Sequence, residues 1–199
     1  MKIYPINPRH KLTVTSPAQT FSEPLTLSEA RDFCEIPDAD TTRDTLLSAY
    51  IVAAREVAEM RQGRDLVEKQ WDLSLNYLPG AFIQLRENAS SVDLFRYRDS
   101  DGAYTTLVEN TDFLFDTSAF LLTPPYNENW PDFTPWPSSA VLIRYTVTPP
   151  AVDEMVKLGM RYLISQWYIN RIPAELGASA VQQFPYCLAL LDHGKVDEA

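Results

Sequence analysis

The spacing of apolar residues changes twice along the chain. It is helical from Leu25 to Gln62, it alternates from Val67 onward, and it becomes helical again from Val152 to Arg171. A spacing of three and four residues gives a helix one apolar face, whereas strict alternation gives a strand one apolar face. The sequence therefore predicts an α+β fold, in which an antiparallel β-sheet module is inserted into a small helical bundle.

The first helical stretch has clear start and stop signals. Thr26 and Glu29 have the spacing of a capping box, and the short helix that follows ends before Pro37. A second helix is expected after the polar turn at 38–42, with Asp40 or Thr41 as its N-cap and Gly63 after its last turn. We expect its inner face to carry Leu46, Leu47, Tyr50, Ala54, Val57 and Met60. Three charged residues are expected to point away from the core: Arg55, Glu56 and Glu59.

Residues 67–148 have the pattern of short strands joined by turns. A half-exposed strand is expected over 67–77, and the DSDG turn at 99–102 predicts a hairpin. Further strands are expected at 82–85, 92–97, 104–108, 113–115, 120–122 and 140–147. The proline-rich stretch between Leu122 and Ala140 interrupts this pattern, because proline prevents regular ladders. We expect an ordered loop there, held by the packing of Tyr126, Trp130, Phe133 and Trp136.

These patterns divide the chain into four parts. The expected parts are an extended N-terminal arm (1–24), a helical bundle (25–66 and 149–192), an inserted β module (67–148) and a flexible tail (193–199). Four prolines make a free-standing helix improbable in the arm. The arm is either a disordered terminus or a segment that lies along a neighbouring subunit through Ile3, Tyr4, Ile6 and Leu12.

The helix expected from Val152 to Arg171 has an apolar arc that is wider than one small core requires. On a helical wheel one stripe contains Val152, Met155, Val156, Gly159, Tyr162, Leu163 and Trp167, with Leu158, Met160 and Ile169 on its flanks. A narrow polar face contains Asp153, Glu154, Lys157, Arg161 and Ser165. This width predicts two neighbours for the helix, one within the fold and one outside it.

Polar residues near the end of this helix have two interpretations. Gln166 and Asn170 lie in the apolar arc beside Trp167, and buried amides require hydrogen-bond partners. They either tie the adjacent loop to the helix within one subunit or specify the packing of repeated subunits. Arg171 is either a contact at the rim of an interface or a charge that complements the helix dipole.

Composition excludes several classes of function. A formal charge of −10 and a pI near 4.6 disfavour a protein that grips nucleic acid through its phosphates. We expect neither a secretory leader nor a membrane span, and the two cysteines, Cys34 and Cys187, are expected to be buried thiols. His10 and His193 have no metal or triad spacing, and no glycine lies in a phosphate-binding motif. We therefore expect no catalytic, cofactor or metal site.

One enzymatic or binding alternative comes from the proline-rich loop. Carbohydrate-binding clefts stack sugar rings on tryptophan, and glycoside hydrolases use two carboxyl groups. Trp130 and Trp136 with Glu128 and Asp132 supply both residue types. A carbohydrate-binding or glycoside-hydrolysing module using the loop 124–137 is therefore the alternative to a structural role.

The order of the parts resembles a known family. The passages PLTLSEARDF, EMRQGRDLVEKQWDLSL, LTPPYNENWP with AVLIRYTV, and QWYINR followed by FPYCLALL resemble the head–tail connector (adaptor) proteins of tailed bacteriophages, prophages and gene transfer agents. The likeness extends over residues 23–192 and rests on the spacing of these passages. The arm and the loop from Pro124 to Pro137 depart from many members of the family.

The resemblance implies a structural, non-enzymatic protein of the virion neck, assembled in the cytoplasm of a host bacterium. It implies a cyclic homo-oligomer of roughly twelve copies beneath the portal, with DNA passing through the ring without specific binding. Partners would be the portal protein and the next tail or stopper protein, with no membrane. The residues expected in the subunit interface are Ile3, Tyr4, Ile6, Leu12, Leu158, Tyr162, Gln166, Trp167, Asn170 and Arg171. Those expected to dock on the portal are Phe184, Tyr186, Leu188 and Leu191.

Overall fold

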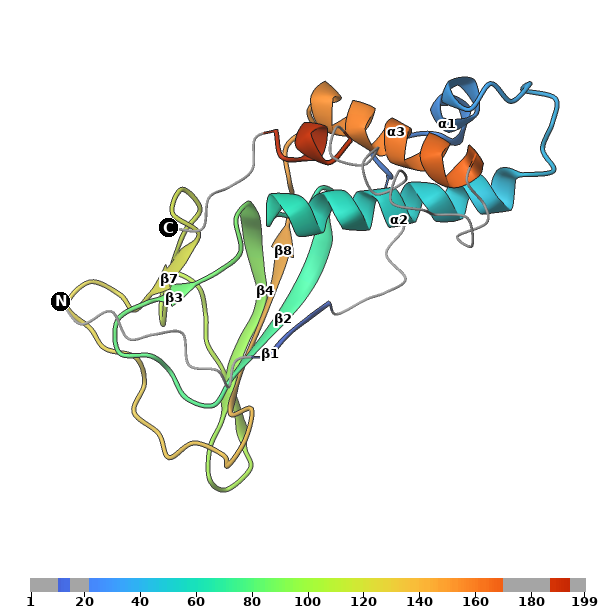
Figure 1. Ribbon diagram of the computed structural model, residues 1–199. Helices are drawn as coiled ribbons and strands as arrows, with labels where there is room; N and C mark the ends of the chain where they lie inside the picture. The colour runs from blue at the N-terminus through green and yellow to red at the C-terminus, as the bar shows by residue number, and fades with distance from the viewer. Residues whose placement is uncertain (1–10, 15–21, 170–186, 194–199) are drawn as a thin grey trace, which may run out of the picture. The chain divides into compact units, whose positions relative to one another are not determined.

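The computed structural model describes residues 11–14, 22–169 and 187–193 (Figure 1). These residues form two compact units, which we call the sheet unit (11–14 and 68–149) and the helical unit (22–67, 150–169 and 187–193). Two antiparallel sheets fill the sheet unit, and its strands β2 to β8 lie between helices α2 and α3 in the sequence. The predicted α+β fold with an inserted antiparallel module is confirmed.

The sheet unit contains a larger and a smaller sheet. The larger sheet has the strand order β1-β2-β8-β4-β5, with bounds β1 Lys11–Val14, β2 Lys69–Leu75, β8 Val141–Val147, β4 Ala89–Arg98 and β5 Tyr104–Thr106. The smaller sheet has the order β3-β7-β6, with bounds β3 Ile83–Gln84, β7 Leu121–Thr123 and β6 Leu114–Asp116. Figure 1 shows β2, β8 and β4 running side by side.

Strict alternation in β8 builds the core of the sheet unit. Val141, Ile143, Tyr145 and Val147 are buried on one face of the sheet, and Ile143 is in register with Leu73 of β2 and Phe95 of β4. On the opposite face, Arg144 Nε and Nη2 donate to the two carboxylate oxygens of Asp72 at 2.8 and 2.9 Å. The larger sheet therefore has one apolar face and one polar face, as the alternation predicts.

The part of the arm that the structure describes is a strand of its own chain's sheet. Lys11–Val14 forms β1, which pairs with β2 and places Leu12 opposite Leu73. Leu12 nevertheless remains exposed at this sheet edge. Ile3, Tyr4 and Ile6, the other residues expected to contact a neighbouring subunit, lie outside the described residues.

The proline-rich loop is ordered by the packing of three of the four aromatic residues predicted to hold it, whereas the fourth, Tyr126, is 88% exposed. Trp130 packs on Phe95, with their ring centroids 5.7 Å apart. Phe133 stacks on Tyr97 at 4.2 Å. These contacts tie the loop to β4, so the rings replace the backbone ladder that proline prevents.

The helical unit contains α1 (Leu27–Phe33), α2 (Asp44–Gln62), α3 (Glu154–Ile169) and a short helical segment at 187–191. The predicted capping box is confirmed, because Glu29 N donates to Thr26 Oγ1 at 3.2 Å and Thr26 N donates to Glu29 Oε2 at 2.7 Å. Gly63 ends α2 with a φ of 70°, the left-handed conformation expected there. One core joins the elements: Leu25, Ala30, Ile36, Leu47, Ile51, Ala54, Ala58, Leu66, Val156, Met160, Leu163, Ile164, Cys187 and Leu191.

The predicted N-cap of α2 is wrong. The cap is Arg43, whose side chain makes no capping hydrogen bond. Asp40 instead accepts hydrogen bonds from Thr42 N at 3.0 Å and Thr42 Oγ1 at 2.6 Å. Its carboxylate is therefore used within the preceding turn, a local alternative that short polar side chains offer to helix capping.

The predicted inner face of α2 is also partly wrong. Met60 is 76% exposed, whereas Arg55, expected to point outward, is only 4% exposed. The buried guanidinium is balanced by two carboxylates, since Arg55 Nη1 donates to Glu59 Oε2 at 2.7 Å and Nε donates to Glu23 Oε2 at 2.9 Å. This pairing allows a charged side chain to occupy the buried face.

The segment 187–193 packs tightly against α2 and α3. Gln62 Nε2 donates to the carbonyl oxygens of Leu191 at 2.9 Å and His193 at 2.8 Å, and Arg61 Nε donates to Asp192 Oδ1 at 3.0 Å. Leu191 is completely buried. It fits against Gly159, where an added Cβ would lie 2.7 Å from Leu191 Cδ2.

Replacing Gly159 with leucine should therefore displace the segment 187–193. The new side chain would overlap Leu191 and Leu190, while leucine's high helix propensity protects α3 itself. We expect the free energy of unfolding to fall by about 1–3 kcal/mol and amide hydrogen exchange in 187–193 to accelerate. Gly80→Leu is the matched control, because the space around Gly80 is open. Unchanged protection in Gly159→Leu would contradict this packing.

Candidate functional site: the outer face of helix α3

Helix α3 presents apolar residues on two opposite sides. Val156, Met160, Leu163 and Ile164 are buried in the core of the helical unit. On the other side lies a row that we call the outer stripe: Met155, Leu158, Tyr162, Ser165 and Ile169. Met155, Tyr162 and Ile169 are 41%, 38% and 70% exposed, and their seven-residue spacing keeps them on one line along the helix. The apolar arc predicted from the sequence thus extends beyond what the core covers.

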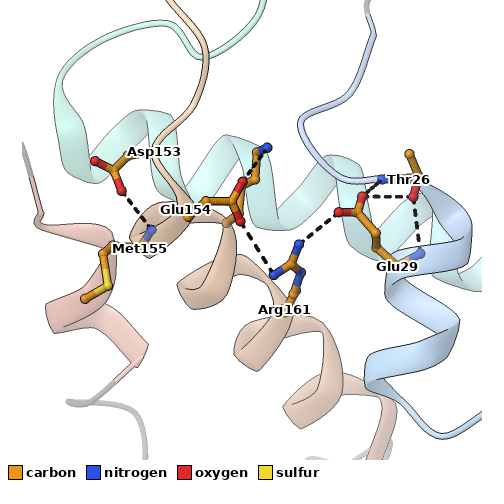
Figure 2. Close-up of polar contacts among 7 residues, drawn as sticks. Thr26, Glu29, Asp153, Glu154, Met155 and Arg161 are labelled. Atoms are coloured by element: carbon orange, nitrogen blue, oxygen red, sulfur yellow. Dashed lines mark hydrogen bonds and ion pairs between the residues drawn. The ribbon is translucent and has the colours of Figure 1, made fainter.

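Ionisable groups border the outer stripe but do not interrupt it. Figure 2 shows Arg161 between two carboxylates, with its Nη2 2.9 Å from Glu29 Oε1 of α1 and its Nη1 3.9 Å from Glu154 Oε2. Lys157 Nζ lies 2.9 Å from the other oxygen of Glu154. These charges are therefore paired within the chain, and the stripe itself remains uncharged.

The capping box at the start of α1 is part of the same network. Hydrogen bonds from the backbone and the side chain of Thr26 lower the pKa of Glu29 below its ordinary value, with a smaller contribution from Arg161. Phe33, at the end of α1, meets the Tyr162 ring edge-on at a centroid distance of 5.3 Å. Helix α1 thus holds Tyr162 in place while leaving part of its ring exposed.

The structure separates the interface residues that the sequence suggested. Leu158 and Tyr162 lie on the outer stripe, and Gln166 is half-buried. Trp167 faces inward, because its ring packs against Tyr50 at 5.8 Å. Asn170 and Arg171 lie outside the described residues. The predicted interface set lacks Met155 and Ile169, which are exposed on the same line as Tyr162, and their heptad spacing is the sequence signal for this exposed row.

A second exposed apolar patch lies on the outer side of α2. Val52 and Met60 are both exposed there, one turn on either side of the exposed Glu56. Ala49, which is exposed, and Ala53, which is half-buried, lie on the same side of the helix. The helical unit therefore presents two different apolar surfaces, one on α3 and one on α2.

The residues expected to dock on the portal are only partly available. Leu191 is buried in the core of its own chain, which is at odds with a contact to a partner through this side chain. Leu188 is half-buried against the same core. Phe184 and Tyr186 lie outside the described residues.

The loop suggested for carbohydrate binding uses its tryptophans for packing. Trp130 is buried against Phe95, and Trp136 is covered by the guanidinium of Arg98, 3.9 Å from the ring centroid. Glu128 and Asp132 are exposed to solvent. Stacking a sugar requires a free ring face, which the buried Trp130 lacks, and Arg98 occupies one face of the half-buried Trp136.

Other chemistry has little support in the described part of the chain. No group of three His, Cys, Asp or Glu residues is placed there to hold a metal ion, and none of its helices is long and apolar enough to cross a membrane. Burial raises the pKa of both the Cys34 and the Cys187 thiols. Both therefore have less thiolate at neutral pH than an exposed cysteine.

Solved structures share this fold along most of the chain. A chain from the neck of an empty gene transfer agent (GTA) particle, computed with C6 symmetry, aligns over 95% of this chain and 97% of its own, with 18% identity and a TM-score of 0.67. A chain from the virion of a native GTA particle aligns over 94% and 96%, with 18% identity and a TM-score of 0.67. A third, from a native GTA neck computed with C12 symmetry, aligns over 91% and 97%, with 18% identity and a TM-score of 0.60.

These comparisons confirm, at the level of the fold, a resemblance to chains of the GTA neck and virion. Nearly the whole of each chain is aligned, so the likeness includes both the helical and the sheet parts. No protein-family model and no curated protein sequence matches the chain. At 18% identity, the likeness shows a shared architecture and does not identify which residues make contacts with a partner.

Glu29 gives the helical unit a pH dependence that can be measured. The pKa of Glu29 is lower in the folded state than its ordinary value of 4.5. The ionised carboxylate therefore stabilises the fold above pH 4.5, and this stabilisation is lost as the pH falls through the pKa of the folded state. We expect Glu29→Gln to be less stable than the parent at pH 7, and the difference to disappear at low pH. Urea unfolding across this range measures both. Glu109→Gln, at an exposed position, is the control, and a difference independent of pH would refute the assignment.

Proposed function

We propose that this chain is a structural head–tail connector (adaptor) of a tailed phage or a phage-like particle such as a gene transfer agent. The observation that supports this most strongly is the shared fold with GTA neck chains along 91–95% of its length. In this proposal the chain has no catalytic role and lies in the virion neck, after assembly in the cytoplasm of a host bacterium. DNA passes through a ring of its copies beneath the portal.

The proposed ring closes through head-to-tail contacts between identical subunits. Such a contact joins two different surfaces of the same chain, and the helical unit carries two. We propose that the outer stripe of α3 packs on the α2 patch of the next copy, where Val52 and Met60 are exposed. The C6 and C12 symmetries of the related necks favour a ring of about twelve copies.

The charge of the chain suits a passage for DNA. With 27 acidic and 17 basic residues, each copy repels a polyanion overall. A duplex inside such a ring would meet few cations that hold its phosphates, so it can move without specific binding. The proposed role therefore needs a passage with few cations that bind DNA phosphates, and it needs no recognition of DNA bases.

The proposed partners above and below the ring are the portal protein and the next tail or stopper protein. The segment from Phe184 onward remains the proposed portal contact. Because Leu191 is held in the core, this contact would use Phe184, Tyr186 and Leu188 and leave Leu191 in place. No membrane is involved.

The proposed ring is tested by measuring the mass of the assemblies that the chain forms. We expect the purified chain, alone or with the portal protein of its particle, to form multi-copy assemblies in native mass spectrometry. Tyr162→Glu and Ile169→Glu should each weaken assembly by at least about tenfold, because a charge would be buried without a partner at the contact.

The control is Tyr126→Glu, which places the same charge at a more exposed aromatic residue of the sheet unit. It should assemble like the parent. A chain that stays monomeric with the portal protein would overturn the proposed function. Assembly that survives both α3 substitutions would overturn only the placement of the contact.

A further inference from the structure

Two arginines on the polar face of the larger sheet differ from Arg144 of the same face in the partners of their guanidinium groups. Arg96 and Arg98 lie on β4, in register with Thr106 and Tyr104 of the edge strand β5. Arg144 of β8 lies on the same face and is held by both carboxylate oxygens of Asp72. The charge of Arg144 is therefore neutralised within the chain.

Neither Arg96 nor Arg98 is paired with a carboxylate within the described residues. Arg96 lies over the Tyr104 ring at 4.4 Å, and its Nε is buried without a hydrogen-bond partner. Arg98 lies 5.2 Å from the same ring and 3.9 Å from that of Trp136, and its Nε donates to Gly102 O at 3.1 Å. The four side chains Arg96, Arg98, Tyr104 and Trp136 form what we call the arginine cluster.

The acidic residues in the adjoining turn do not neutralise the cluster. Asp99 Oδ1 accepts hydrogen bonds from the backbone N–H groups of Asp101 and Ala103, both at 3.0 Å. Asp101 is exposed at the tip of the turn. In a chain with 27 acidic and 17 basic residues, two guanidinium groups stacked on aromatic rings are thus left available for an external anion.

Among the strands that the structure describes, β5 lies at the edge of the larger sheet and has no neighbour on its outer side. Leu107 N donates to Phe95 O at 2.8 Å, and Asp99 N donates to Ala103 O at 3.1 Å. Every second residue thus makes the backbone hydrogen bonds to β4, and Tyr104 and Thr106 are the residues in between. The backbone groups of Tyr104 and Thr106 therefore point away from β4, at the edge of the sheet. All three residues of β5 are exposed, including Tyr104 at 56%.

We propose that this edge binds an extended acidic segment of another protein. The segment would add a strand to β5 through the backbone groups of Tyr104 and Thr106, and its carboxylates would meet the guanidinium groups of Arg96 and Arg98. Backbone pairing at a sheet edge supplies affinity, and side-chain pairing supplies specificity. The inference does not depend on the proposed ring, since it concerns the sheet unit of a single copy.

A protein segment fits the cluster better than DNA does. Duplex binding relies on many phosphate contacts, whereas this cluster offers two guanidinium groups on a chain of net charge −10. Arginine, tyrosine and tryptophan are also the residue types that dominate protein–protein hot spots. The free strand edge requires an extended backbone as its partner, which a DNA duplex lacks.

The test is NMR titration of the intact chain with a short peptide that alternates Glu with Thr. We expect saturable shifts of the Tyr104 and Thr106 amides and of the Arg96 and Arg98 Nε–H groups. The same peptide with Gln in place of Glu should bind at least about tenfold more weakly, because charge-assisted hydrogen bonds are lost. Arg96→Gln and Arg98→Gln should each reduce affinity for the Glu peptide by a similar factor.

The matched control is Arg86→Gln, which removes another arginine stacked on an aromatic ring, 4.6 Å from that of Trp71. It should leave the affinity unchanged, and unaltered amide dispersion in each variant confirms folding. Equal binding of the Glu and Gln peptides, or no binding of either, would overturn the proposal. A short DNA duplex that shifts the same signals while the Glu peptide does not would overturn it in favour of a nucleic-acid site.

Discussion

Helix α3 carries apolar residues on two opposite faces, and the helical unit covers only one of them. The inner face is packed closely enough that Gly159 has no room for a side chain beside Leu191. The outer stripe keeps Met155, Tyr162 and Ile169 in contact with solvent. Burial of apolar surface is the main driving force of association, and the remaining exposed surface of this row, largest at Ile169, is available for it.

The ion pairs of the helical unit neutralise charges at the border of the outer stripe and on the buried side of α2. Arg161 is bound between Glu29 and Glu154 at the border of the stripe, and Arg55 is neutralised by Glu59 and Glu23 on the buried side of α2. These charges are satisfied within the chain, so they neither repel an apolar neighbour nor attract an anion. The proposed contact between copies would therefore rely on shape and apolar area, and it would include the exposed Glu56 that lies between Val52 and Met60.

Local signals in the sequence predicted local structure well. The Thr26–Glu29 capping box, the left-handed Gly63 and the alternation of β8 are each specified by residues close together in the chain, and all three are present. The wide apolar arc of α3 was also readable from spacing alone. The same pattern could not say which part of the arc the core would cover.

The N-cap of α2 was missed through a local competition, because Asp40 bonds to Thr42 within the preceding turn. Other features depend on residues that are distant in the sequence. Burial of Arg55 depends on Glu23, 32 residues away, and so escapes a rule that places charges outside. The burial of Leu191 also depends on residues far along the chain, because it packs against Gly159 of α3 and its carbonyl oxygen accepts a hydrogen bond from Gln62 of α2. The arginine cluster was not found from the sequence either, since Trp136 joins it only through the folding of the proline-rich loop onto β4.

The two candidate surfaces differ in the physics that would hold a partner. Contact through the outer stripe gains its free energy from buried apolar area, which salt weakens little. Contact through the arginine cluster relies on half-buried charges at the surface, whose attraction for an external anion falls once ionic strength shortens the screening length to about 10 Å or less. A chain built this way can keep one association permanent while the other responds to its surroundings. The proposed role would use both properties, because the proposed ring would persist while its proposed partners are added in sequence.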